Sequence, residues 1–318
     1  MTELRLGLIG AGRWGRRYIH TLNAVSGMRL VRLASSNPES NSIVGEDCIV
    51  SPEWHDVATD STLDGLIIAT PPALHAQMTE TALNAGLHVL VEKPMTLTTK
   101  DARRLVEASR ANRKMVFVGH THLFSNSFRT LKGMGSRLGT LREIRSSAGN
   151  WGPYRPDTSV LWDWAPHDLA MCLDLIGGDP TVVSAQQVRT TMLPDGPGES
   201  IAITLEFGDL TRARINVSNI DHEKSRRFEA RFDDGTLVYN DLAPCKLCLV
   251  TAANAMSQEL PVGNSLPLDN LLNEFATEIR SGSTSHTSLG LGVRVVELIT
   301  ECQHTLERGG TMATAKES

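Results

Sequence analysis

The stretch LRLGLIGAGRWG, residues 4–15, decides the fold of the first part of the chain. Its first half, residues 4–9, is a short apolar run that is typical of a buried β-strand. Gly10, Gly12 and Gly15 follow with the spacing that lets a strand turn sharply into a helix beside a pyrophosphate. Backbone amides at the start of such a helix bind phosphate groups, so the stretch predicts a dinucleotide site. The alternative is a tight strand–helix turn that binds nothing.

Short apolar runs alternate with segments of helical periodicity up to about residue 120. A chain that alternates in this way forms a parallel sheet with helices on both faces. Thr98 or Thr99 would cap one helix, because a hydroxyl there accepts from a backbone amide of the first turn. The expected strands are residues 4–9, 28–34, 66–69, 88–91 and 115–118. The expected helices are residues 14–25, 73–85 and 100–111.

The pattern changes after about residue 120. Apolar residues alternate with small or polar ones at 201–207 and again at 213–217, which predicts a half-buried antiparallel hairpin with its turn at residues 208–209. Further strands are expected at 228–232 and 237–239, and helices at 162–176, 267–280 and 290–307.

The sequence therefore predicts an α/β protein with two domains. An N-terminal Rossmann domain with a doubly wound parallel sheet precedes an α+β domain with a mainly antiparallel open sheet. We expect residues 1–119 to bind the dinucleotide, and residues 120–318 to bind the substrate and mediate oligomerisation.

Composition sets limits on the class of protein. The chain has 318 residues, of which 41% are hydrophobic and 21% charged, and its net charge is −5. A chain of this length usually divides into two domains. It has no long apolar stretch, and its Arg and Lys residues are dispersed. We therefore expect neither a membrane span nor a nucleic-acid surface.

Five cysteines are scattered through the chain, an odd number that fits a reducing cytoplasm. Cys245 and Cys248 have the CxxC spacing of many zinc sites. No second pair of Cys or His residues lies nearby in the sequence, so we expect no metal site. Both residues are interpreted as buried or strand cysteines.

A second informative junction is Glu92-Lys93-Pro94, directly after the strand expected at 88–91. Proline ends the strand because it has no amide hydrogen to donate to the sheet. Glu92 and Lys93 should therefore stand at the carboxyl edge of the sheet, where open α/β folds bind ligands. A lysine in such a place is costly unless it has a partner or a chemical role. Taken alone, however, a Lys-Pro strand exit is more often structural than catalytic.

The end of the second expected strand bears on the choice of dinucleotide. Folds that prefer NAD usually have an acid there, which binds the ribose hydroxyl groups. This chain has Ser35, Ser36 and Asn37 at that place, and its first acid is Glu39. Without a repelling carboxylate, hydroxyl and amide donors together with Arg13 can hold a 2′-phosphate, which favours NADP over NAD. The alternative is that the serines and the asparagine only form a turn.

Another strand exit, Ala69-Thr70-Pro71, is followed by His75 one turn later. As part of a site, its backbone would line the nicotinamide half of the cofactor. As ordinary structure, it is a strand exit followed by a helix that begins with proline.

Asp163 and His167 are four residues apart near the start of the helix expected at 162–176, so they share one face of it. Oxidation of an alcohol needs a base that takes the hydroxyl proton while hydride leaves. His167 suits this role because histidine titrates near neutral pH, and Asp163 could orient its ring. Lys93 could bond the substrate oxygen, and Trp162 could stack on a sugar ring or pack in the core. Each residue alone is more often structural, but the set favours catalysis.

Together these segments resemble the glucose-fructose oxidoreductase/inositol dehydrogenase (Gfo/Idh/MocA) family over essentially the whole chain. The resemblance rests on the glycine motif, on residues 69–71 with His75, on residues 88–94, and on the pair of Asp163 and His167. The order and separation of the Glu-Lys-Pro strand exit and of the later Asp/His pair are specific features of that family.

The resemblance implies roles for several residues. Lys93 and His167 would be catalytic with Asp163 beside them, and Glu92 would approach the nicotinamide ribose. It also implies a sugar, cyclic polyol or nucleotide sugar as substrate. A homodimer or homotetramer that packs through the C-terminal sheet is the expected assembly.

Two segments are similar to the nucleotide-sugar branch of the family in particular. They are GHTHLF at residues 119–124, which contains His120, and NWGPYRPD at residues 150–157, which contains Arg155. In this interpretation His120 contacts the substrate, and Arg155 pairs with a sugar phosphate.

We thus expect an NAD(P)-dependent oxidoreductase that transfers a hydride between a secondary alcohol or ketone of such a substrate and the nicotinamide. The alternatives are a reductase of C=N or C=C bonds, a net non-redox enzyme with a tightly held cofactor, and a non-catalytic dinucleotide sensor. Ser127 and Ala170 depart from the family pattern, which leaves the substrate open. The predicted cofactor-binding residues are Gly10, Gly12, Arg13, Trp14, Gly15, Ser35, Ser36, Asn37, Thr70, Pro71, His75 and Glu92.

Overall fold

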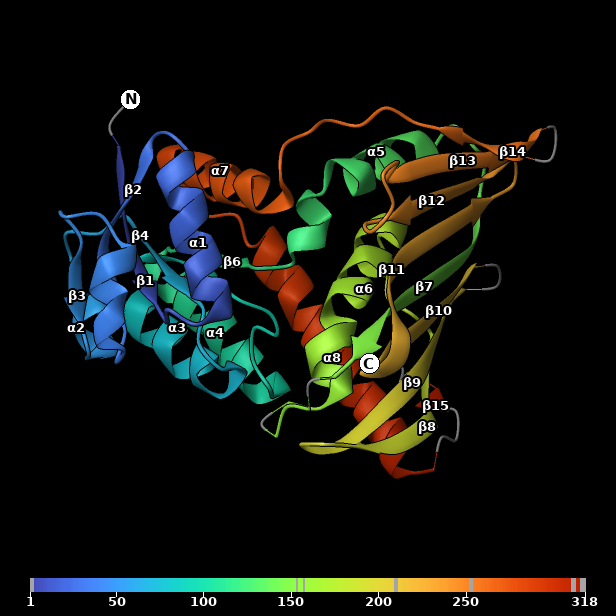
Figure 1. Ribbon diagram of the computed structural model, residues 1–318, viewed down its shortest axis with the longest axis horizontal. Helices are drawn as coiled ribbons and strands as arrows, with labels where there is room; N and C mark the ends of the chain where they lie inside the picture. The colour runs from blue at the N-terminus through green and yellow to red at the C-terminus, as the bar shows by residue number, and fades with distance from the viewer. Residues whose placement is uncertain are drawn as a thin grey trace. The chain divides into compact units, whose positions relative to one another are not determined.

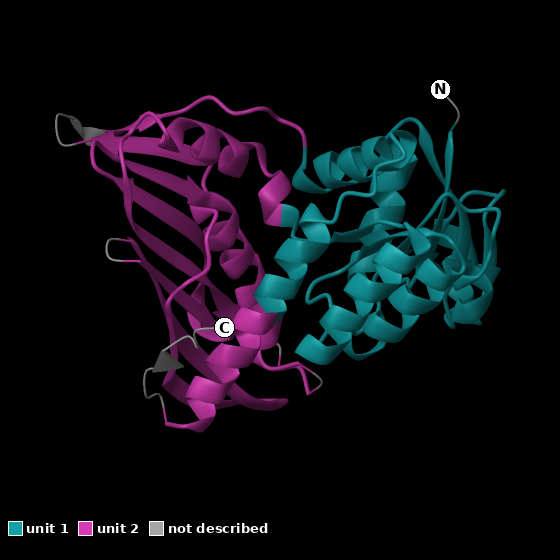
Figure 2. Ribbon diagram, turned by 180° about the vertical axis from the view of Figure 1, so that it is seen from behind, with its two compact units in different colours: residues 1–121, 266–296 teal, residues 122–265, 297–318 magenta. Residues whose placement is uncertain are grey.

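The computed structural model describes residues 3–152, 154–156, 158–208, 211–251, 254–309 and 313–314. These residues form two compact units (Figure 2). The first unit contains residues 1–121 and 266–296, and the second contains residues 122–265 and 297–318. The last long helix, α8 (Thr287–Glu307), contributes to both units. The assignment of cofactor binding to residues 1–119 and of substrate binding to residues 120–318 stays a prediction.

The first unit is built on a sheet of six described strands. They are β1 (Leu4–Ile9), β2 (Met28–Ala34), β3 (Ile49–Ser51), β4 (Gly65–Ile68), β5 (His88–Val91) and β6 (Val116–Val118). The strands lie in the order β3-β2-β1-β4-β5-β6, and every neighbouring pair is parallel. Its helices are α1 (Arg13–Ala24), α2 (Trp54–Ala58), α3 (His75–Asn84), α4 (Thr99–Asn112) and α7 (Pro267–Arg280), together with part of α8. The predicted doubly wound parallel sheet is therefore confirmed (Figure 1).

The strand order reverses between β1 and β4, which is the place where such folds bind ligands. Nearly every residue of β4, β5 and β6 is buried, as expected of strands that are covered on both faces. Helix α7 packs closely at Gly65, where a Cβ atom would lie 3.0 Å from Ile279 and 3.2 Å from Phe275. This packing explains why residues 266–296 belong to the first unit.

The second unit is built on a sheet of nine described strands. They are β7 (Leu141–Trp151), β8 (Val182–Leu193), β9 (Gly196–Phe207), β10 (Thr211–Ser218), β11 (Ile220–Phe232), β12 (Thr236–Asn240), β13 (Leu247–Thr251), β14 (Asn254–Glu259) and β15 (Ala313–Thr314). All neighbours are antiparallel except β7 and β10, so the predicted mainly antiparallel sheet is confirmed. The predicted hairpin is formed by β9 and β10, with Ile203 opposite Ile215. Part of its expected turn, Asp209, lies outside the described residues.

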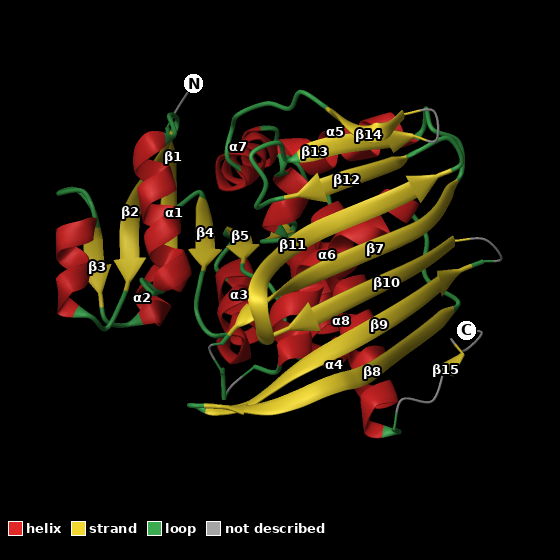
Figure 3. Cartoon of the chain, turned by 45° about the vertical axis from the view of Figure 1, so that its right-hand side comes forward, coloured by secondary structure: helices red, strands yellow, loops and turns green. Residues whose placement is uncertain are grey.

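Helices cover one face of this sheet and leave the other face open (Figure 3). Helix α6 (Val160–Ile176) packs on β7, β9 and β10, and α5 (Asn126–Gly135) packs on β12. Ile203 and Ile215 are buried beneath these helices. On the opposite face, Glu143 forms ion pairs with Arg145 at 3.1 Å and with Arg214 at 2.8 Å. The face that the helices leave open is therefore strongly charged.

Most predicted elements are present with boundaries shifted by one to three residues. Helix α6 begins at Val160 instead of 162, and α8 begins at Thr287 instead of 290. The side chain of Thr98 caps α4 by accepting from the amide of Asp101 at 3.0 Å, as predicted. Among the described residues, no helix has the length and apolar character needed to cross a membrane.

Candidate active site

The glycine-rich turn between β1 and α1 has the geometry that a pyrophosphate needs. Gly10 has φ +99°, and a Cβ atom there would lie 2.6 Å from the carbonyl oxygen of Ala69. A Cβ atom at Gly15 would lie 1.9 Å from the carbonyl oxygen of Gly10, so only glycine permits this packing. A Cβ atom at Gly12 would meet nothing within 4 Å, which means that open space adjoins the backbone there. The turn therefore fits a bound dinucleotide phosphate.

This turn borders a pocket of about 600 Å³. The pocket brings together the predicted cofactor residues Gly10, Gly12, Arg13, Ser35, Ser36, Asn37 and Thr70. Its other lining residues are Ile9, Ala11, Arg16, Ala34, Pro52, Trp54 and Met78. No acidic residue is among them, whereas two arginines are. The pocket therefore favours an anionic ligand.

The serines and the asparagine at the end of β2 both shape the turn and line the pocket. The hydroxyl groups of Ser35 and Ser40 are hydrogen-bonded at 2.7 Å. Asn37 caps the short 3-10 helix Pro38–Ile43 by accepting from the amide of Glu39 at 3.0 Å. These residues therefore form the turn that the alternative interpretation expected. They also line the pocket, so a role in binding the dinucleotide is tested below.

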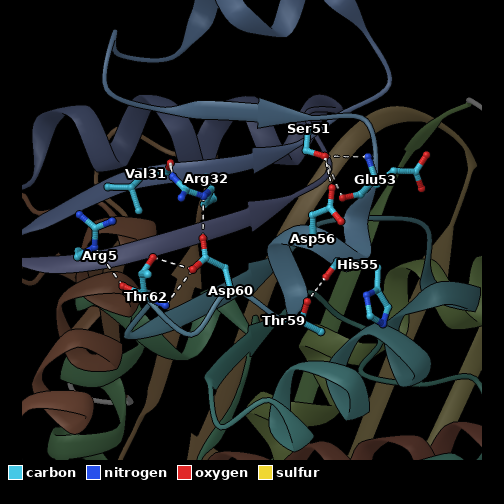
Figure 4. Close-up of polar contacts among 10 residues, drawn as sticks. All are labelled: Arg5, Val31, Arg32, Ser51, Glu53, His55, Asp56, Thr59, Asp60 and Thr62. Atoms are coloured by element: carbon cyan, nitrogen blue, oxygen red, sulfur yellow. Dashed lines mark hydrogen bonds and ion pairs between the residues drawn. The ribbon is translucent and has the colours of Figure 1, made fainter.

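Helix α2 carries Trp54 into the pocket lining and is anchored at both ends (Figure 4). At its start, the hydroxyl of Ser51 donates to the carboxylate of Asp56 at 3.0 Å. Just after its end, Asp60 forms an ion pair with Arg32 of β2 at 2.7 Å. These contacts fix the tryptophan relative to the sheet.

Five predicted cofactor residues are not part of the pocket lining: Trp14, Gly15, Pro71, His75 and Glu92. The ring of Trp14 lies under the guanidinium of Arg17, 4.7 Å from it, and Pro71 is exposed. Gly15 acts through packing, as described above.

His75 is buried between two strand exits. Its Nδ1 atom lies 2.8 Å from the carbonyl oxygen of Pro94, and its Nε2 atom lies 2.8 Å from that of Thr70. Burial lowers the pKa of His75, although both carbonyl contacts oppose this shift. The imidazole thus connects the backbone after β4 with the cis Lys93–Pro94 peptide after β5. His75 thus positions the backbone on both sides of the site by its two carbonyl contacts.

Glu92 is buried beside Lys93 and is held by a residue that the sequence analysis missed. The hydroxyl of Tyr18, on α1, donates to Glu92 Oε1 at 2.6 Å, and the amide of Lys93 donates to Oε2 at 3.2 Å. Burial raises the pKa of Glu92, while Tyr18 and the charge of Lys93 lower it. A Cβ atom at Gly119 would lie 3.1 Å from Oε1, so the glycine after β6 makes room for the carboxyl group.

His120 joins this group from the end of β6, the strand next to β5. It is buried, and burial followed by the charge of Lys93 lowers its pKa to about 3. The imidazole is therefore neutral at physiological pH. Glu92, Lys93 and His120 thus gather at the carboxyl edge of the first unit's sheet, where parallel sheets bind ligands.

In the second unit, α6 carries both Asp163 and His167 within two turns of its start. The carboxylate of Asp163 forms an ion pair with Arg155 at 3.2 Å, and both line a pocket of about 330 Å³. His167 is 5% exposed and lines a separate, smaller cavity. Trp162 is buried, and its indole N–H donates to Gln303 at 2.9 Å. Trp162 thus lies in the packing of the unit instead of in either pocket lining.

Several residues at these sites were not named as site residues by the sequence analysis. Arg16 and Trp54 line the dinucleotide pocket, and Tyr18 holds Glu92. His122 and Tyr239 lie beside His167 in the second unit. Two of them had a local clue: Arg16 follows the glycine motif directly, and His122 lies in the GHTHLF segment.

Comparisons with known proteins agree with this geometry. The model of an oxidoreductase family with an NAD-binding Rossmann fold matches residues 4–120, and the model of the GFO/IDH/MocA C-terminal domain matches residues 134–238. A solved structure from Magnetospirillum magnetotacticum MS-1, provisionally assigned as an oxidoreductase, is 39% identical with a TM-score of 0.89. The match covers 95% of this chain and 100% of that chain.

Two relatives with named activities match three quarters of the chain. UDP-N-acetylglucosamine 3-dehydrogenase of Acidithiobacillus ferrooxidans is 29% identical over 74% of this chain and 73% of its own length. The NADP(+)-dependent scyllo-inositol 2-dehydrogenase of Bacillus subtilis is 26% identical over 74% of this chain and 68% of its own length. The chain therefore belongs to the Gfo/Idh/MocA family of NAD(P)-dependent oxidoreductases.

Proposed function

We propose that this enzyme transfers a hydride between a secondary alcohol of a sugar, polyol or nucleotide sugar and NADP. The observation that carries the proposal is the gathering of Glu92, Lys93 and His120 at the carboxyl edge of the sheet that also carries the glycine-rich turn. The dinucleotide, when bound, supplies the acceptor or donor of the hydride. The residues of the chain bind the substrate and move its proton.

Lys93 and His167 have complementary roles in this proposal. The ammonium group of Lys93 donates a hydrogen bond to the oxygen of the reacting carbinol. His167 takes the hydroxyl proton during oxidation and returns it during reduction. Asp163 and Arg155 together contact other polar groups of the substrate. The central assumption to be tested is that Lys93 and His167 act on the hydroxyl group of the same carbon atom.

Replacing these residues tests the assignment. We expect Lys93→Ala and His167→Ala each to lower turnover about 100- to 10,000-fold, the range for the loss of a positioned acid or base. Binding of the dinucleotide, followed by its fluorescence, should stay within a few-fold. Lys100→Ala and His222→Ala are matched controls, because both side chains are exposed and lie outside the sites. Near-full activity of both site variants would exclude this mechanism.

The preference for NADP is supported by the charge of the dinucleotide pocket. Arg13 and Arg16 line it together with Ser36, and no carboxylate repels a 2′-phosphate. The Bacillus subtilis relative is NADP(+)-dependent by name. Fluorescence titration should give tighter binding of NADPH than of NADH. Tighter binding of NADH would overturn the preference and leave the reaction type untouched.

The substrate class is supported by the relatives, which act on a nucleotide sugar and on an inositol. A panel of free polyols, sugar phosphates and nucleotide sugars, assayed with both dinucleotides by absorbance of the reduced cofactor, tests it. If only free polyols are turned over, Arg155 does not bind a substrate phosphate. Absence of turnover with every alcohol would overturn the proposed function.

We also propose a homodimer or homotetramer that forms through the open face of the second unit's sheet. The ion pairs of Glu143 with Arg145 and Arg214 show that this face carries both signs of charge, which suits pairing with a second copy. Sedimentation at micromolar concentration should show a dimer or tetramer that high salt weakens. A monomer under all conditions would contradict this assembly.

A further inference from the structure

The imidazole of His167 is packed against a second histidine within the second unit. His122 lies on the short 3-10 helix Thr121–Phe124, and its ring meets that of His167 edge to face, with centroids 4.8 Å apart and planes at 79°. Such contact restricts the rotation of both rings. The orientation of His167 therefore depends on what holds His122.

His122 is held by Tyr239, which lies on β12. The Nδ1 atom of His122 and the hydroxyl oxygen of Tyr239 are 3.1 Å apart. Tyr239 is 2% exposed, and its hydroxyl also interacts with the carboxylate of Asp241 and the hydroxyl of Ser125. Burial, followed by the charge of Asp241, raises the pKa of Tyr239, so it remains a phenol that can donate and accept.

The direction of these hydrogen bonds follows from the strength of the acceptors. A carboxylate is a stronger acceptor than a neutral imidazole, so the phenol of Tyr239 donates to Asp241. Its oxygen then accepts from Nδ1–H of His122. This tautomer leaves Nε2 of His122 as an acceptor, and the negative end of the chain polarises it.

A small cavity connects the chain of hydrogen bonds with His167. Its volume is about 10 Å³, about the space that one water molecule requires. His122, His167, Tyr239 and Asp241 all line it. The cavity therefore has the room and the polar lining groups that a water molecule needs to bridge the two imidazoles.

We propose that His122 and Tyr239 are positioning residues for His167, and that the chain from His122 through Tyr239 to Asp241 stabilises its protonated form. The inference rests on the proposed function, in which His167 takes the hydroxyl proton of the substrate. The imidazolium that forms is then stabilised by the carboxylate of Asp241, which acts through two neutral groups and also forms an ion pair with Lys246 at 3.0 Å. The role resembles that of an aspartate that orients a catalytic histidine.

Other charged groups face the same cavity and set the background for this effect. They are Asp168 on α6 and Arg226 and Arg227 on β11. Ser146, on β7, donates to Asp168, which fixes one of these carboxylate oxygens. Asp163, by contrast, forms its ion pair with Arg155 in the other pocket. The chain through Tyr239 therefore approaches His167 from β12, whereas Asp163 lies on α6, the same helix as His167.

Nuclear magnetic resonance of the full-length protein tests the proposal without a substrate. Histidine labelled with ¹³C and ¹⁵N reports the tautomer of His122 and the titration of His167, with His167→Gln and His122→Gln assigning the signals. In the parent protein, His122 should carry its proton on Nδ1. In Tyr239→Phe this preference should be lost, and the midpoint of the His167 titration should fall by about half a unit, a threefold change in proton affinity. An unchanged tautomer and midpoint would overturn the proposal.

Kinetics with any substrate found in the panel provides the second readout. Tyr239→Phe should lower turnover about tenfold and move the acid limb of the pH–rate profile to lower pH, because less proton affinity is left at His167. His122→Gln, whose amide can still donate to Tyr239, should retain more activity than His122→Ala. His222→Asn, an exposed histidine in the same unit, should change neither property.

The two hypotheses fail in different ways. If the parent protein oxidises no alcohol, the proposed function fails, and the resonance experiment still decides whether Tyr239 controls His122 and His167. If the parent is active and Tyr239→Phe and His122→Ala match it in turnover and pH profile, the positioning role is overturned. A loss of activity that Tyr239→Phe shows equally at all pH values, with an unchanged histidine titration, would also count as a purely structural effect and overturn it.

Discussion

Replacing Tyr18 by Phe removes one hydroxyl group from the interior of the first unit and leaves the ring in place. The side chain is fully buried, and its hydroxyl donates to Oε1 of Glu92 at 2.6 Å. The other carboxyl oxygen accepts from the amide of Lys93 at 3.2 Å. Because phenylalanine fills the same space, the variant measures the loss of this hydrogen bond.

The size of the effect depends on pH, because Glu92 titrates. Burial raises its pKa above the ordinary 4.5, and the bond from Tyr18 opposes this rise, so its removal raises the pKa further. At a pH where the buried carboxyl is protonated in both folded proteins, the loss is that of a neutral hydrogen bond, about 1 kcal/mol. The unfolded chain titrates alike in both proteins, so the loss grows as the pH rises through the folded-state pKa of the parent and then through the higher one of the variant, which must bury the charge with one donor fewer. The loss should then reach about 2–3 kcal/mol.

Thermal unfolding at pH 5 and pH 8 measures this difference. For a unit of this size, a loss of about 2 kcal/mol lowers Tm by roughly 4–8 °C. Tyr154→Phe, in the half-exposed part of the second unit, is the control and should change Tm little. In a Glu92→Gln background, Tyr18→Phe should cost the same at both pH values. An equal loss at pH 5 and pH 8 in the parent background would refute the reasoning.

Further predictions follow from single contacts. Gly15→Ala should prevent stable folding of the first unit, because its Cβ would lie 1.9 Å from the carbonyl oxygen of Gly10. Gly12→Ala, whose Cβ would meet nothing within 4 Å, should keep the Tm of the parent and weaken NADPH binding. Equal melting temperatures of both variants would contradict this. Arg16→Ala should weaken the binding of NADPH about tenfold more than that of NADH, as fluorescence titration would show, and equal weakening would exclude a contact with the 2′-phosphate. Burial raises the pKa of Asp60, but hydrogen bonds from Thr62 and the charge of Arg32 outweigh burial and hold this pKa below 3.8. The ionised carboxylate therefore stabilises the fold at neutral pH, and this stabilisation is lost as the pH falls through the folded-state pKa. Asp60→Asn should lower the urea midpoint at pH 7 more than at pH 3. Trp162→Phe should lower Tm through the lost bond to Gln303 and leave KM unchanged, and a large rise in KM would instead favour a contact with the substrate.

The sequence predicted the first unit better than the second because of how each sheet is buried. Parallel strands covered on both faces are short continuous apolar runs, and residues 4–9, 28–34 and 88–91 match the observed strands without change. Strand β8 was missed because all of its residues from 186 to 192 are exposed, so no alternation of buried and exposed residues marks it. Strand β3 and helix α2 were missed because they are only three and five residues long.

For the candidate site, the sequence by itself determined those features that depend only on residues close together in the chain. The glycine spacing, the proline that ends β5 and the spacing of Asp163 and His167 on one helix depend on neighbours within a few residues. Membership of the Gfo/Idh/MocA family and the oxidoreductase class followed from the resemblance that these local patterns carry, and the comparisons confirmed both.

Only the tertiary structure decided which side chains contact the proposed site residues. Tyr18 meets Glu92 across 74 residues of chain, and His122 meets Tyr239 across 117. It also decided that Trp162, equally suited to a sugar ring or to a core, lies in the packing. Burial and hydrogen bonding between distant segments are properties of the folded chain, because they arise only when separate strands and helices exclude water from the same volume.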